Sequence, residues 1–342
     1  MSRRLMVPFI RSRRAAMSAF VLLTVASFLT PAHAQRMFEF HGDPIPPEVE
    51  TVYQRGLEYL VKAQQPSGAF AGQSGNQAGV VGFALLAMLA HGEDPNVGPY
   101  AKSIKLGLNY LLTKAQKSNG YIGTSMYNHG FATLALAEAY GAVDDPRLGP
   151  ALKKAVTLIL TAQASNPNGA WRYSPTSQAA DTTVSGAQMV ALFAARNAGL
   201  DVPDAAIEKG LQFFSRTMAP AGGFGYTSPS SSSPPRTAIG TLVFALAKRK
   251  DSQEFQAGFR NLREMNARAN QHLYYYLYYA SQAYFHADME AWNEWNVVNI
   301  KRLGSIQNAD GAWPGSNGPV FSTSTALLSL AVNYRFLPIY ER

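Results

Sequence analysis

The chain has 342 residues with 30 basic and 22 acidic side chains, a formal net charge of +8. Five of the basic side chains are arginines among the first 34 residues, so residues 35–342 carry 25 basic and 22 acidic side chains. Their net charge of +3 does not indicate a nucleic-acid partner. Cysteine is absent, which excludes disulfide bonds and thiolate chemistry.

Residues 1–34 have the pattern of a secretory signal peptide. Arginines precede an apolar run over 17–30, and the segment 31–34, Pro-Ala-His-Ala, ends in the small-x-small pattern of a cleavage site. We expect cleavage after Ala34 and export to the periplasm or the extracellular space. The pair Arg13-Arg14 leaves twin-arginine export open beside general secretion. The apolar runs are too short for a comfortable transmembrane helix, so no membrane span is expected.

Residues 35–47 are interpreted as a linker and residues 48–342 as a single all-α domain of six helix pairs. In each pair an amphipathic segment, typical of an outer helix, precedes a segment that is apolar nearly all round and must be surrounded by protein. The pairs in chain order are approximately 48–64 with 78–90, 99–116 with 128–140, 150–163 with 182–197, 204–218 with 237–248, 251–266 with 273–286, and 291–307 with 324–334.

A turn that combines glycine with an aromatic residue recurs between the two helices of a pair. Its glycines at 68, 120, 169 and 223 are 52, 49 and 54 residues apart, a period that suits two helices and two connections. The next such turn contains Gly311, and the 88-residue gap before it holds one further pair. Six pairs with short connections predict a closed (α/α)6 toroid, with an open solenoid as the alternative.

The turn over 307–313, Gln-Asn-Ala-Asp-Gly-Ala-Trp, resembles the Gln-Trp repeat of squalene and hopene cyclases. Residues 64–70 repeat its spacing, and residues 127–134, Tyr-Asn-His-Gly-Phe-Ala-Thr-Leu, are similar to the head of an inner helix in protein prenyltransferase β subunits. The resemblance covers nearly all of the mature chain and implies an exported member of the terpenoid cyclase and protein prenyltransferase superfamily. We expect the glutamine amide to bond the last helical carbonyls and the aromatic ring to wedge between outer helices.

The sequence departs from the catalytic motifs of these families. Class II terpenoid cyclases use an Asp-x-Asp-Asp cluster as an acid, whereas the nearest segment here, 181–184, contains a single carboxylate, Asp181. Prenyltransferase β subunits hold zinc with Asp, Cys and His, and this chain has no cysteine. Only His129, Asp181 and His272 could assemble a histidine-rich metal site. Because these three residues do not complete a zinc motif, we predict neither a metal nor another cofactor.

The inner helices all begin at the end of the ring that carries the turns. Their amino termini should therefore converge on one mouth with a positive potential that suits an anionic group. Candidate ligand-binding residues at this mouth are Asn128, Arg236, His272, Tyr274, Tyr275 and Tyr278. The tyrosines suit an isoprenoid chain through dispersion contacts or a sugar ring through stacking, and an aromatic seam between helices is the alternative explanation.

Three residues at the mouth are candidates for a catalytic role. Asp181 is better explained as a helix N-cap, and His129 as a hydrogen-bonded structural histidine. Arg236 lies at an inner-helix start, where the helix dipole disfavours a cation, so an anionic partner is expected. That partner is either Asp181 or a ligand.

Three functions are compatible with these features. The first is a cyclase-like or prenyltransferase-like protein that binds an apolar or isoprenoid-type ligand with an anionic group, its reaction unassigned. The second is a carbohydrate-active toroid enzyme, a polysaccharide lyase or hydrolase, since residues 311–314, Gly-Ala-Trp-Pro, resemble a segment of some pectate lyases. A hydrolase would need two carboxylates that face the cavity, but only Asp181 lies at a predicted inner-helix start, and Glu138 lies deeper along its helix. A lyase would need a basic residue, for which Arg236 is available. The third is a non-catalytic interaction module of the cell envelope. The expected partner is a small molecule or a glycan, and the protein is expected to be a monomer.

Overall fold

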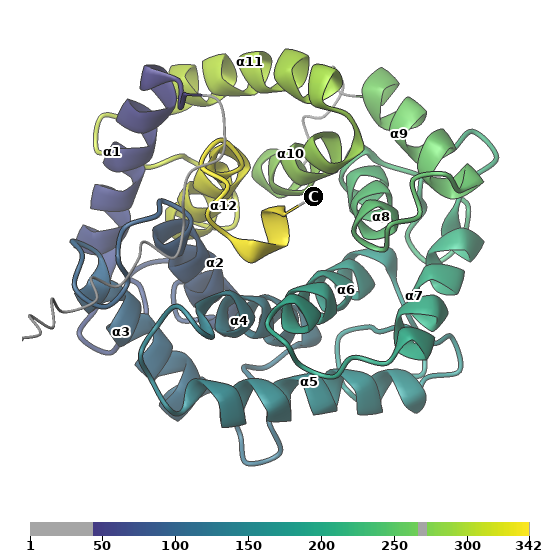
Figure 1. Ribbon diagram of the computed structural model, residues 1–342, viewed down its shortest axis with the longest axis horizontal. Coiled ribbons are helices and arrows are strands. Elements are labelled where there is room, and N and C mark those ends of the chain that lie inside the picture. Colours follow the sequence, from purple (N-terminus) through teal and green to yellow (C-terminus); the bar gives the residue numbers. More distant parts are fainter. Residues whose placement is uncertain (1–43, 266–271, 342) are drawn as a thin grey trace, which may run out of the picture. The chain divides into compact units, whose positions relative to one another are not determined.

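The computed structural model describes residues 44–265 and 272–341, so the predicted signal peptide and most of the predicted linker lie outside the described residues. Within these residues twelve α-helices alternate between an outer and an inner ring, with no β-sheet (Figure 1). The outer helices are α1 (Pro47–Ala63), α3 (Ala101–Tyr110), α5 (Leu148–Ala164), α7 (Asp204–Thr217), α9 (Gln253–Met265) and α11 (Met289–Ile306). The inner helices are α2 (Ala78–Leu89), α4 (Met126–Ala139), α6 (Thr182–Asn197), α8 (Pro234–Leu246), α10 (Leu273–Ala287) and α12 (Pro319–Ala331).

Both rings are closed, which confirms the predicted (α/α)6 toroid. Each inner helix contacts the next one along the chain, and α12 contacts α2, while α1 contacts α11 and α12 (Figure 1). Three inner helices begin earlier than predicted: α4 at Met126, and α8 and α12 with a proline, at Pro234 and Pro319. Proline is favoured in the first turn of a helix because its φ is already helical and its missing N–H is not needed there.

Inner helices are buried on every side because small residues let them approach one another closely. All twelve residues of α2 are buried. A Cβ added to Gly82 of this helix would lie only 2.8 Å from the carbonyl oxygen of Phe131 in α4. Among the helices of the described residues, none is long and apolar enough to cross a bilayer.

The side chains of the turn glutamines form hydrogen bonds between neighbouring outer helices. The expectation that the amide bonds the last helical carbonyls is wrong, because the amide reaches a carbonyl near the start of the next outer helix. It also bonds the turn glycine in three cases, including Gln307 Nε2 to the oxygen of Gly311 at 2.9 Å. The bonds between helices run from Gln64 to Ser103 at 3.0 Å, Gln116 to Ala151 at 2.9 Å, Gln163 to Ala206 at 2.8 Å and Gln307 to Val52 at 2.9 Å.

The turns share one register, in which a glycine with positive φ precedes a buried wedge by two residues. The glycines are 68, 120, 169, 222 and 311, and the wedges are Phe70, Ile122, Trp171, Phe224 and Trp313. Two turns differ from the prediction: Gly222 takes the left-handed position instead of Gly223, and the wedge of the second turn is an aliphatic residue, Ile122, instead of an aromatic one. At Gly311 any Cβ would lie 2.2 Å from the carbonyl oxygen of Arg55, so the turn requires glycine.

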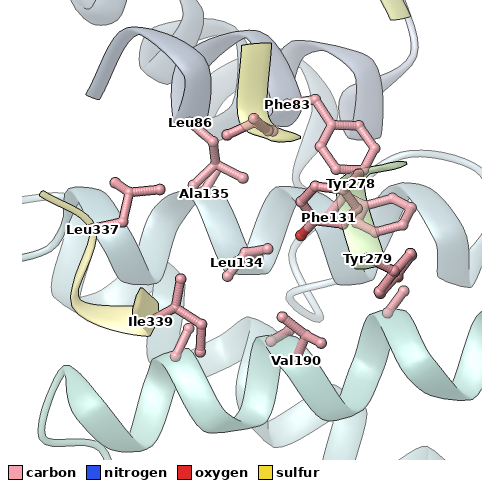
Figure 2. Close-up of a cluster of buried hydrophobic side chains, with 14 of the residues drawn as sticks. Phe83, Leu86, Phe131, Leu134, Ala135, Val190, Tyr278, Tyr279, Leu337 and Ile339 are labelled. Carbon is pink, nitrogen blue, oxygen red and sulfur yellow. The ribbon is translucent and has the colours of Figure 1, made fainter. Parts of the chain in front are cut away.

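The carboxy-terminal segment lies inside the inner ring (Figure 1), near the carboxy-terminal end of α4. A short 3-10 helix, η3 (Pro338–Tyr340), places Leu337, Ile339 and Tyr340 in the interior, each 3% exposed. Its polar contacts come from the carboxy-terminal ends of inner helices: Glu138 of α4 accepts from the N–H of Ile339 at 3.4 Å. Figure 2 shows Leu337 and Ile339 on one side of Leu134. On the other side lie the aromatic residues Phe83, Phe131, Tyr278 and Tyr279.

Candidate functional site

A cavity of about 480 Å³ lies at the amino-terminal end of the inner ring. Residues at or near the first turn of all six inner helices line it, as expected for the predicted mouth. The volume falls within the roughly 300–1,000 Å³ typical of small-molecule sites. A second cavity of about 260 Å³ adjoins it between the starts of α10 and α12 and shares the lining residues His272, Tyr275, Asn317 and Phe321.

The deep part of the cavity is apolar and its rim is polar. Phe83, Phe131, Phe321 and Tyr275 supply aromatic surface, and Phe83 and Phe131 have ring centroids 4.2 Å apart. Side-chain amides, hydroxyls and one guanidinium, that of Arg236, line the rim. In the described part of the chain no carboxylate lines this cavity. The helix amino termini and the arginine together give it a positive potential.

Arg236 contributes a partly buried cation to the cavity wall. Its guanidinium carbon lies 5.8 Å from the ring centre of Tyr226, and its Nη2 donates to the carbonyl of Ser231. Its Nε is buried and has no hydrogen-bond partner among the described residues, and no described carboxylate lies within 4.0 Å of the guanidinium. Burial lowers the pKa of this guanidinium, which Tyr226 and Asp181 partly oppose. Arg236 therefore retains an unused donor beside the cavity.

Asp181 is the N-cap of α6, and the expectation that it could pair with Arg236 is wrong. Its Oδ1 accepts from the N–H groups of Thr183 at 3.0 Å and Val184 at 2.9 Å, as an N-cap side chain should. Its Oδ2 faces Nε of Arg172 at 3.7 Å. The side chain is 0% exposed, and this burial raises its pKa although the hydrogen bonds and Arg172 oppose it. The carboxylate does not line the cavity.

His129 has a structural role instead of the catalytic one considered for it. Its Nδ1 accepts from the N–H of Ile122 at 3.1 Å, and its Nε2 contacts the carbonyl oxygen of Ala155 at 3.1 Å. Burial lowers its pKa to about 4, so the ring is neutral at neutral pH. Side chains are the equivalent acceptors for three of the other four wedges: Ser185 for Trp171, Thr237 for Phe224 and Thr323 for Trp313.

The tyrosines predicted to line the cavity divide between two roles. Tyr275 lines both cavities and Tyr274 lines the smaller one. Tyr278 lines neither; it is 2% exposed and packs edge-on against Phe83, with ring centroids 5.1 Å apart (Figure 2). The structure therefore does not bring Tyr278 to either cavity, because its position on α10 directs it into the core.

Asn128 and His272 both line the main cavity. The amide of Asn128 is already committed, since its oxygen accepts from the N–H of Gly79 at 2.9 Å and its nitrogen donates to Ser125 at 3.1 Å. His272 precedes α10 in a left-handed conformation, with φ 54°. In the described part of the chain, no three His, Cys, Asp or Glu side chains are arranged to hold a metal ion.

Sequence reasoning missed Arg172 and Tyr226. Arg172 pairs with Asp181 and lies with its guanidinium carbon 5.6 Å from the ring centre of Tyr226, which also contacts Arg236. Both missed residues directly follow turn segments, Arg172 after Trp171 and Tyr226 after Phe224 and Gly225. Their position directly after a turn could have identified them as site residues, because every turn leads to the mouth of the ring.

No protein-family model matches this sequence, and neither does any curated protein sequence. Several solved structures share the fold. A type II terpene cyclase from Scytonema in complex with geranylgeranyl dihydroxybenzoate is 15% identical, with a TM-score of 0.57 over 85% of this chain and 98% of the cyclase chain. A D-mannose isomerase is 12% identical, with a TM-score of 0.63 over 84% of this chain and 98% of its own. A family 76 glycoside hydrolase from a bovine Bacteroides thetaiotaomicron strain is 9% identical, with a TM-score of 0.60 over 83% and 77%.

Proposed function

We propose that the ring binds an apolar or isoprenoid-type ligand in the cavity, with an anionic group of the ligand near Arg236. The observation that carries this proposal is Arg236, a partly buried cation with an unused donor and no described carboxylate partner, in the wall of a cavity that aromatic side chains also line. An arginine at a helix start is already disfavoured by the helix dipole, so an anion is the natural partner for it. The terpene cyclase that shares the fold was solved with a geranylgeranyl substrate, which supports the apolar part of the proposal.

No reaction is part of this proposal. Alkene protonation in a class II cyclase needs an acid at the cavity, and the single candidate, Asp181, has one oxygen committed to the helix cap and the other to Arg172. Its carboxylate is also absent from the cavity lining. The supported activity is therefore binding.

The test uses farnesyl monophosphate and neutral farnesol as matched probes. Arg236→Ala should weaken binding of the phosphate by roughly 10- to 100-fold, because a hydrogen bond to a charged group contributes about 1.5–3 kcal/mol. Farnesol affinity and the melting temperature should stay nearly unchanged. Titration calorimetry and a thermal melt measure these quantities, with the exposed Arg260→Ala on α9 as the control. Equal loss for both probes, or no loss for either, contradicts the role of Arg236.

A carbohydrate ligand is the second candidate, and the rim favours it specifically. Hydroxyl and amide groups there, including Gln77, Ser233 and Asn317, match the hydroxyls of a sugar, and two of the structures that share the fold are a mannose isomerase and a glycoside hydrolase. Two-carboxylate hydrolysis is disfavoured, since no described carboxylate lines the cavity. An acidic oligosaccharide that binds in the same calorimetric assay, where both farnesyl probes fail, would select this candidate. Failure of all three ligands would favour the envelope interaction module.

We also propose that residues 1–34 direct export. The support is the order of arginines, apolar run and small-x-small site. Expression of the full chain in a Gram-negative host should yield a periplasmic protein. Its intact mass should equal that of a chain that begins at Gln35. A cytoplasmic protein that retains Met1 or Ser2 would refute export, and Ala34→Leu should block cleavage without changing the mature fold.

A further inference from the structure

The hydroxyl of Tyr127 lies at the end of a hydrogen-bond chain that begins at Asp181. Oδ1 of Asp181 accepts from two backbone N–H groups and also from the hydroxyl of Thr183 at 2.7 Å. An oxygen that caps N–H groups is an acceptor, so the Thr183 proton must point toward it. This direction holds for either protonation state of the carboxyl, because a proton on it would occupy Oδ2, away from the three donors.

The direction of the Thr183 proton determines the direction of the next one. A hydroxyl has a single proton, so the Thr183 oxygen can only accept from Tyr127, whose hydroxyl contacts it. The Tyr127 proton therefore points toward Thr183, and the remaining lone pair of Tyr127 is free for another donor. Both residues line the main cavity. The wall presents an acceptor at Tyr127, where an unconstrained phenol would offer either role.

Arg236 has the opposite character on the same cavity. A guanidinium only donates, so it matches an anionic oxygen. An acceptor-only group placed against the Tyr127 oxygen would face a second acceptor. It would give up its hydrogen bonds to water and gain none in return, which disfavours its binding. The two residues thus require different things from one ligand: negative charge at Arg236 and a hydrogen-bond donor at Tyr127.

We infer that Tyr127 selects ligands that carry an O–H donor beside their anionic group, such as a hydroxylated acid or a singly protonated phosphate or phosphonate, over acceptor-only anions such as sulfonates. The inference rests on the proposed binding function and adds to it the chemical class of the polar group of the ligand. Thr183 acts as the positioning residue, since it determines which way the Tyr127 proton points.

The test compares decylphosphonate with decanesulfonate by titration calorimetry in mildly acidic buffer. Both probes have the same chain and a single negative charge there, but only the phosphonate keeps an O–H proton. The protein should bind the phosphonate at least about fivefold more tightly, the size expected for one net hydrogen bond of about 1 kcal/mol.

Two variants identify the source of this preference. Tyr127→Phe should remove it by weakening the phosphonate, because the acceptor is lost. Thr183→Val should remove or reverse it by tightening the sulfonate, because the Tyr127 proton is then free to turn toward the ligand. Thr133→Val is the matched control: Thr133 is a buried threonine of α4 that bonds only the carbonyl of His129 and does not line the cavity. Thermal melts verify that each variant is folded.

The outcomes separate this inference from the proposed function. Equal affinity of the unsubstituted protein for both probes would overturn donor selection while leaving anion binding supported. A preference that survives in both Tyr127→Phe and Thr183→Val would overturn the assignment to Tyr127. Binding of neither probe by folded protein would overturn the proposed function and the inference with it.

Discussion

Deleting residues 337–342 should lower the free energy of unfolding by roughly 4 kcal/mol or more. Burial of each large apolar side chain contributes about 1.5–3 kcal/mol, and Leu337, Ile339 and Tyr340 are all buried inside the ring. The deletion also exposes the inner-helix walls that they cover (Figure 2). Urea unfolding monitored by circular dichroism measures the change.

The matched control for the deletion is Tyr340→Phe. It keeps the buried ring and removes only a hydroxyl that lies 3.5 Å from the carbonyl oxygen of Leu328, so its stability should be close to that of the unsubstituted protein. A deletion variant with unchanged stability would show that the segment covers the ring without contributing to its core.

Glu138→Gln should stabilise the protein in alkaline solution and flatten its stability between about pH 5 and pH 8. Burial raises the pKa of the Glu138 carboxyl from 4.5 to about 8. Between these values the folded protein holds one more proton than the unfolded chain, so stability falls as pH rises, by about 1.4 kcal/mol per pH unit. The contribution of this carboxyl is fully present below its unfolded pKa and is lost as pH rises through its folded pKa. Glutamine cannot ionise and removes this slope.

Chemical denaturation at a series of pH values measures the effect, which should reach a few kcal/mol near pH 8. Glu58→Gln on the outer surface is the control, because its side chain is 66% exposed. Combining Glu138→Gln with the deletion of 337–342 gives a further check. Without the segment that covers it, the carboxyl should be hydrated, and the substitution should then have little effect. An equally steep pH dependence in Glu138→Gln would assign the slope to other groups.

The helix pairs could be predicted because their signals are local. A glycine that must adopt positive φ, such as Gly169, can be recognised in the sequence alone. So can an all-apolar run such as that of α2. The partner of each turn glutamine is not local. Gln163 bonds Ala206, 43 residues away, and only the ring arrangement determines which outer helix lies beside it. Where two glycines are adjacent, as at 222 and 223, the pattern alone cannot say which one is left-handed.

The position of the candidate site was predictable, whereas its internal pairing was not. All inner helices run in one direction, so Arg236 and Tyr275 could be assigned to one mouth without any contact information. Whether Asp181 meets Arg236 or Arg172 depends on side-chain directions across two helix pairs, which periodicity does not contain. The segment Leu337–Tyr340 was missed for a related reason: it is too short for periodicity, and its partner Glu138 is 201 residues away from Ile339.

Closure of the ring joins the first helix to the last turn and so affects the order of folding. Gln307 bonds the carbonyl of Val52, and Arg55 bonds that of Asn308 at 2.8 Å, contacts separated by 255 and 253 residues. At a synthesis rate of about 5–20 residues per second, α1 exists for roughly 10–50 s before these partners emerge. Local helix pairs can form during that interval, but contacts of such high sequence separation form slowly. Helix α1 can thus meet α2 and α3 early, but it completes its contacts only when α11 and α12 have been made, and until then the rest of its apolar stripe must be kept from other partners.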